Sequence, residues 1–240
     1  MVGSLLLRGM LAGVLAGLLA VMFGALIGEP SIERAIAYES AAAQAAGEPP
    51  EPAIVSREVQ RGAGLLTAGA VYGAALGGVF GLAFAFAYGR IGGTDPRIVS
   101  AFLAGAGFVA IALVPALKYP ANPPAIGAAE TIGARTALYF IMALGSLLAM
   151  IIVAMIGQWL ADRVGDWNAG FACAALFVAA VGAAAFLLPP VDEVPTEFPA
   201  DLLRRFRLAS LGVQAVLWAA LGLSFGAMTP SAHYGAAARG

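Results

Sequence analysis

The chain has 240 residues, of which 61% are apolar and only 11% are charged, and its formal net charge is −1. Soluble domains carry roughly 25% charged residues, so these charges are too few to cover a water-facing surface, and a soluble domain is excluded as the bulk of the chain. The near-neutral charge lacks the basic footprint of a nucleic-acid-binding protein, and the single cysteine, Cys173, excludes a disulfide within the chain.

Six apolar stretches are long enough to cross a membrane as helices. A helix rises about 1.5 Å per residue, so roughly 20 apolar residues span the hydrocarbon core. Continuous apolar runs, rather than alternating ones, favour helices over strands. The expected spans cover residues 5–27, 62–88, 98–117, 136–160, 169–188 and 208–228. We therefore predict an all-α integral membrane protein, with residues 1–240 forming one polytopic membrane domain.

The connections between the expected spans alternate in length. Residues 28–61, 118–135 and 189–207 form long loops rich in proline and acidic residues, whereas 89–97 and 161–168 are short. Because two helices joined by a loop leave the membrane on the same side at that loop, this alternation predicts three helical hairpins. Their long loops would lie on one face of the membrane.

Residues 31–46, in the first long loop, have the composition of a short helix. Ser31 is suited to the N-cap position, alanines propagate the helix, and Gly47 is suited to end it. Its apolar side would let this helix lie on the membrane surface. A proline-rich spacer at 48–52 then leads to Ser56, which can cap the second span.

Glycines recur every four residues in three of the expected spans. This spacing places them on one face of a helix and lets a neighbouring backbone approach closely, which favours helix association in lipid. These glycines are Gly9, Gly13 and Gly17 in the first span, Gly69, Gly73, Gly77 and Gly81 in the second, and Gly222 and Gly226 in the last. We predict that they are helix-packing surfaces; a glycine-lined substrate path is the alternative.

The sequence offers no catalytic pattern. No acid, lysine or histidine lies deep within an expected span, where such residues usually mark proton relays and ion paths. Metalloprotease, phosphate-loop and dinucleotide-binding motifs are also missing, and the one histidine, His233, lies in a tail of small residues. We therefore predict no enzymatic activity and no resident cofactor.

Two carboxylates at the start of the first long loop are candidate cation ligands. Glu29 and Glu33 lie one helical turn apart, a spacing at which two carboxylates can share a divalent cation. A solvated acidic helix start is the alternative interpretation.

Two further groups of candidate ligands lie in the other long loops. Asp192 and Glu193 stand between prolines that fix the loop, and they could capture a cation or pair with an arginine. The arginines considered for that pairing are Arg204, Arg205 and Arg207. Asn122 lies among prolines that free several carbonyl groups, so it could bind an ion or belong to a rigid turn.

Several motifs distributed along the chain resemble those of a known family. They are Leu-Leu-Leu-Arg-Gly-Met-Leu-Ala-Gly at 5–13, Gly-Glu-Pro-Ser-Ile-Glu-Arg-Ala-Ile-Ala-Tyr-Glu at 28–39, Val-Ser-Arg-Glu-Val-Gln-Arg-Gly at 55–62, Lys-Tyr-Pro-Ala-Asn-Pro-Pro at 118–124, Leu-Pro-Pro-Val-Asp-Glu-Val-Pro at 188–195 and Phe-Pro-Ala-Asp-Leu-Leu-Arg-Arg-Phe-Arg-Leu-Ala-Ser at 198–210. Together they resemble the CbtA family, predicted cobalt transporter subunits of bacteria. The resemblance runs from about residue 5 to residue 228.

The resemblance implies cobalt uptake linked to cobalamin synthesis, with Co²⁺ as the transported ion. It also implies a small one-span partner, CbtB, that carries a histidine-rich tail. Family members often have histidines in the first long loop, whereas residues 40–47 contain none here. Because Co²⁺ favours imidazole over lone carboxylates, either the partner supplies the histidines or this chain no longer captures metal.

The expected location is the bacterial cytoplasmic (inner) membrane. Lysine and arginine are more numerous in the long loops, which by the positive-inside rule alone would place those loops in the cytoplasm. Their acidic, proline-rich character and the resemblance favour the outer face instead. We expect both termini in the cytoplasm.

Three functions remain open from the sequence. The first is a membrane subunit that passes a divalent metal, and the second is a non-transporting accessory subunit packed within a larger membrane complex. The third is a small-molecule binder similar to the substrate-capture subunits of vitamin importers. We favour the first.

Overall fold

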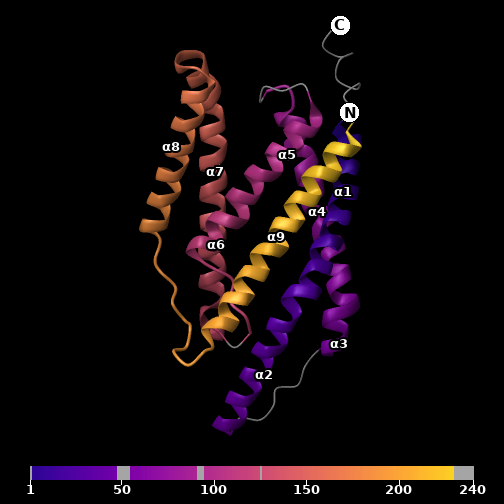
Figure 1. Ribbon diagram of the computed structural model, residues 1–240, viewed down its shortest axis with the longest axis vertical. Helices are drawn as coiled ribbons and strands as arrows, with labels where there is room; N and C mark the ends of the chain where they lie inside the picture. Colours follow the sequence, from indigo (N-terminus) through magenta and orange to yellow (C-terminus); the bar gives the residue numbers. More distant parts are fainter. Residues whose placement is uncertain (1, 48–54, 91–94, 125, 230–240) are drawn as a thin grey trace. The chain divides into compact units, whose positions relative to one another are not determined.

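The computed structural model describes residues 2–47, 55–90, 95–124 and 126–229 (Figure 1). The α-helices are α1 (Val2–Phe23), α2 (Glu29–Ala46), α3 (Arg57–Val59), α4 (Leu65–Ala87), α5 (Pro96–Gly107), α6 (Val114–Lys118), α7 (Ile132–Val164), α8 (Asp166–Leu187) and α9 (Ala200–Met228). Three π-helical turns, η1 (Gly24–Gly28), η2 (Gln60–Gly64) and η3 (Phe108–Leu113), and one 3₁₀ turn, η4 (Ala129–Thr131), join or precede them. No strand occurs in these ranges.

Six helices are long and apolar enough to cross a membrane, which confirms the predicted all-α architecture with six spans. They cover Val2–Ala46, Arg57–Ala87, Pro96–Lys118, Ile132–Val164, Asp166–Leu187 and Ala200–Met228. Each extends beyond the corresponding apolar stretch at one end or both, because the flanking residues continue the helix.

The first helix differs from the sequence-based expectation at its middle. The helix predicted at 31–46 is not separate, because α1, η1 and α2 form one continuous rod (Figure 1). Ser31 is a buried residue in the interior of this continuous helix and does not cap a helix end. Its predicted N-cap role was therefore wrong. The reason is that Gly28 keeps helical backbone angles, φ −86° and ψ −41°, and nothing before Ser31 stops the helix.

Two helix boundaries agree with the predictions. Gly47 ends α2 in the left-handed conformation, with φ +74°, which glycine adopts without a steric penalty. The Ser56 hydroxyl accepts a hydrogen bond from the Val59 amide at 3.4 Å and so caps α3. The predicted spacer at 48–52 and His233 lie outside the described residues.

The chain packs as two compact units. Unit 1 comprises residues 1–105, 121–126 and 194–240, and unit 2 comprises 106–120 and 127–193. In unit 1, α1 packs against α4 and α9. In unit 2, α7 packs against α8 and against η3 and α6. The third span thus belongs to unit 1 in its first half and to unit 2 in its second.

The antiparallel helices α1 and α4 meet through their glycines. Gly9 faces Gly77, Gly13 faces Gly73 and Gly17 faces Gly69. A Cβ atom built on Gly9, Gly13, Gly17, Gly73 or Gly77 would come within 3.0 Å of an opposing carbonyl oxygen, a distance that real Cβ atoms essentially never show. A Cβ on Gly81 would likewise lie 2.6 Å from the Leu5 carbonyl oxygen. We call these glycines the α1–α4 glycine ridge; here the two backbones touch.

The glycines of α9 face α5 within unit 1. A Cβ on Gly222 would lie 2.5 Å from that of Ala104, and one on Gly226 would lie 3.1 Å from the Arg97 Cα. At the same crossing the fully buried Ser100 hydroxyl donates a 2.7 Å hydrogen bond to the Gly222 carbonyl oxygen. Small residues therefore permit an interhelical hydrogen bond that lipid could not replace.

Candidate functional site

The two candidate ligands of the first long loop lie at the start of α2, and each is paired with an arginine. Glu29 forms an ion pair with Arg57, and Glu33 forms one with Arg61, with 3.0 Å between Oε1 and Nη1. Both arginines belong to the short segment α3–η2 before α4. The one-turn spacing of the acids is thus matched by the one-turn spacing of the arginines.

The two ion pairs differ in their surroundings. The Glu29 side chain is 16% exposed, whereas that of Glu33 is 52% exposed. Water screens an exposed pair and limits it to about 0–1 kcal/mol, but screens a partly buried pair less. The Glu29–Arg57 pair is therefore the stronger of the two connections between α2 and the α3–η2 segment.

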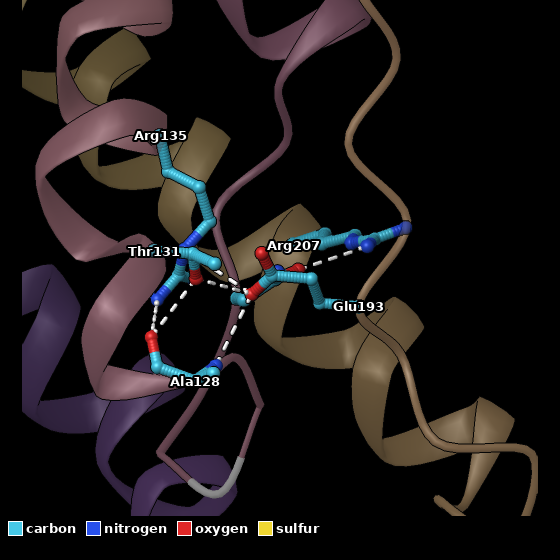
Figure 2. A network of polar contacts seen from close by, with 6 residues as sticks. Ala128, Thr131, Arg135, Glu193 and Arg207 are labelled. Carbon is cyan, nitrogen blue, oxygen red and sulfur yellow. Dashed lines mark hydrogen bonds and ion pairs between the residues drawn. The ribbon is translucent and has the colours of Figure 1, made fainter.

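Glu193 binds the segment that leads into α7 (Figure 2). Its Oε2 atom accepts hydrogen bonds from the Ala128 amide at 3.2 Å and from the Thr131 hydroxyl at 3.0 Å. The same oxygen lies 3.3 Å from Arg135 Nε. One carboxylate oxygen thus fastens residues 128–135 to the end of the loop that follows α8.

Gly127 makes room for this arrangement. Its φ is +102°, a left-handed conformation that favours glycine, and a Cβ there would come within 3.0 Å of the Arg135 guanidinium. Arg135 Nη2 also donates to the Ala128 carbonyl oxygen at 3.3 Å. The guanidinium therefore lies over a bare backbone that only glycine leaves open.

The partner of Glu193 corrects one expectation. Among the arginines considered, Arg204 and Arg205 bind Asp201 of their own helix, at 2.8 and 2.7 Å. Glu193 pairs with Arg135 instead, from the start of α7. Its neighbour Asp192 is exposed and forms no ion pair within the described part of the chain.

Asn122 is also engaged by an arginine. Its side-chain oxygen accepts a 2.9 Å hydrogen bond from Arg207 Nη2. Both residues belong to unit 1. The carbonyl-type oxygen proposed as an ion ligand therefore already has a cationic neighbour.

Three arginines occupy similar places relative to the long loops and the helices that follow them. Each stands near the start of the helix that leaves a long loop, and each contacts a candidate ligand: Arg57 with Glu29, Arg135 with Glu193 and Arg207 with Asn122. The Nε atom of each is buried without a hydrogen bond; that of Arg135 lies near Glu193 but is not aligned for one. Sequence reasoning missed Arg57 and Arg135; the available signal was an arginine just before an apolar run.

The candidate ligands belong to two different units of the chain. Glu29, Glu33 and Asn122 belong to unit 1, whereas Asp192 and Glu193 belong to unit 2. Within the described ranges no group of three or more histidine, cysteine, aspartate and glutamate side chains is close enough to hold a metal ion.

A protein-family model described as "Probable cobalt transporter subunit (CbtA)" matches residues 2–230. No curated protein and no solved structure matches the chain. The family match covers all six membrane-spanning helices and the polar loops between them. The chain therefore belongs to the CbtA family of probable cobalt transporter subunits.

Proposed function

We propose that this chain is the multi-span subunit that moves Co²⁺ across the bacterial cytoplasmic membrane, inward, with both termini in the cytoplasm. The observation that carries the proposal is a family match over residues 2–230 on a chain with six membrane-spanning helices. We assign it no enzymatic reaction, because transport requires only that ligands exchange around the ion.

In this proposal the carboxylates of the long loops make transient contacts with the ion. Glu29, Glu33 and Glu193 each lie beside an arginine, and a neighbouring guanidinium repels a divalent cation. The arginine must therefore move away before Co²⁺ can bind. Such weak, exchangeable binding suits conduction, which requires an ion to leave each site as readily as it enters.

A second subunit would complete the ligand set. Co²⁺ prefers imidazole to lone carboxylates, and residues 40–47 of the first long loop contain no histidine. The family description names a subunit. We infer that a small membrane partner similar to CbtB supplies imidazole at the outer face.

The site assignment is tested by cobalt accumulation in cells that produce the chain together with its partner. The variants Glu29→Gln, Glu33→Gln and Asp192→Asn should each lower accumulation, by up to about tenfold for a ligand worth ~1.4 kcal/mol. Asp201→Asn is the matched control, because it removes an exposed carboxylate that binds only arginines of its own helix. Unchanged accumulation in all three variants would remove the site assignment and favour a non-transporting accessory subunit.

A further inference from the structure

The closely packed helices α1 and α4 both leave α-helical geometry shortly beyond the glycine ridge. The π turn η1 follows α1, and the π turn η2 precedes α4. Because the helices are antiparallel and Gly17 faces Gly69, both turns lie beyond the same end of the ridge. π turns are rare, and they often mark sites where a helix has a functional role.

The contacts change in kind at these turns. Along the ridge the two backbones touch, so that neither helix can move without losing many contacts at once. Beyond the ridge, two ion pairs, Glu29–Arg57 and Glu33–Arg61, connect the two helical segments. Neither α3 nor η2 contains a buried residue.

The α2 side of these ion pairs is anchored independently. Ala35 is fully buried in a cluster with Phe198 and Leu202 of unit 1. The ring of Tyr38 packs edge-on against that of Phe198, with 5.1 Å between centroids. Since α2 is held by this apolar contact, α3–η2 is the side that can move.

Gly62 provides the pivot. Its backbone angles, φ −104° and ψ −109°, are not helical, so the helix is interrupted inside η2. A Cβ atom on Gly62 would meet nothing within 4 Å, so the space beside Gly62 is open. Glycine also has the largest backbone freedom of any residue.

We propose that residues 57–61 form a hinged arm that pivots at Gly62 and is latched to α2 by the Glu29–Arg57 and Glu33–Arg61 ion pairs. Opening the arm withdraws both arginines and frees the two carboxylates. The hinge itself does not depend on which ion the protein carries. Where the proposed function holds, the arm controls when Glu29 and Glu33 can accept the cation.

The test is a distance measurement between spin labels on the full chain in lipid nanodiscs without added metal, with Cys173 replaced by serine. One label pair, at Ala37→Cys and Val59→Cys, reports on the arm; both positions are exposed. A second pair, at Leu15→Cys and Val71→Cys, reports on the ridge from exposed positions 44% and 65% accessible. Since no metal is present, failure of the hinge and failure of cobalt transport are separate results.

Releasing the latch with Glu29→Gln and Glu33→Gln together should raise the ratio of longer to shorter distances for the arm pair about tenfold, while the ridge pair stays unchanged. Gly62→Ala alone should also shift the arm-pair distances, because ψ −109° lies outside the regions allowed to a residue with a Cβ, so alanine strains the latched conformation. Asp201→Asn should leave both pairs as they are. An arm distribution unaffected by the latch variant, or equal broadening of the ridge pair, overturns the proposal.

Discussion

Gly13 of α1 and Gly73 of α4 meet backbone to backbone, and a Cβ on either would collide with the carbonyl oxygen of the other. This contact lies at the centre of a ridge in which glycines spaced four residues apart on one helix face glycines spaced four apart on the next. Lipid offers no hydrophobic drive for helices to associate, so this close van der Waals fit is what holds the first two spans together.

Gly13→Ala should therefore destabilise the protein, by about 1–3 kcal/mol as expected for overpacking. Gly170→Ala is the matched control, because Gly170 lies in α8 and a Cβ there would meet nothing within 4 Å. That substitution should be neutral or stabilising, since alanine favours helix more than glycine does. Unfolding in a denaturing-detergent titration measures both, and equal effects would contradict the ridge.

Glu193→Ala should loosen the start of α7. The Ala128 amide loses its acceptor and Arg135 loses its ion-pair partner. Hydrogen exchange, followed by mass spectrometry of peptides covering residues 127–135, should become faster. The neighbouring Asp192→Asn variant should exchange like the unmodified protein, because Asp192 is exposed; faster exchange in both would show a general effect of loop charge instead.

The Asn122–Arg207 contact predicts opposite effects for two substitutions at one position. Asn122→Asp should keep the acceptor oxygen and add a charge opposite the guanidinium, which should raise the unfolding temperature. Asn122→Ala should lower it, because a partly buried guanidinium loses its partner, at a cost of about 1–3 kcal/mol. Thermal unfolding followed by circular dichroism would refute the contact if both variants shifted the temperature in the same direction.

Removing the Ser100 hydroxyl tests the crossing of α5 and α9. Ser100→Ala loses a buried hydrogen bond to the Gly222 carbonyl oxygen and should destabilise the protein by roughly 0.6–2 kcal/mol, the range measured for interhelical hydrogen bonds in membranes. Ser224→Ala is a suitable control, since its hydroxyl bonds carbonyl oxygens of its own helix. Equal losses in the detergent titration would argue against an interhelical contribution.

The helices could be predicted from the sequence because hydrocarbon offers no hydrogen-bond partners to the backbone. A continuous apolar run must satisfy its own backbone hydrogen bonds, and all six runs do so as helices. The end of α2 at Gly47 followed from glycine's access to left-handed angles. Its start did not, because Ser31 as an N-cap requires a break that the helical backbone at Gly28 does not provide.

The sequence identified the acidic residues of the candidate site but not their arginine partners. Acidic residues in loops are easy to find, but their partners come from segments far along the chain, as for Glu29 with Arg57 and Glu193 with Arg135. Such pairing depends on how helices pack, which periodicity within one helix does not report. The glycine ridge shows the same limit, since its spacing predicts a packing face but not which glycine faces which.

The most direct test of the account is the initial rate of ⁵⁷Co²⁺ entry into bacterial cells that lack other cobalt uptake systems. Cells that produce this chain and its small membrane partner should take up cobalt faster than cells that produce the partner alone. Equal rates with and without this chain, while it is folded and present in the membrane, would contradict the claim that it moves Co²⁺.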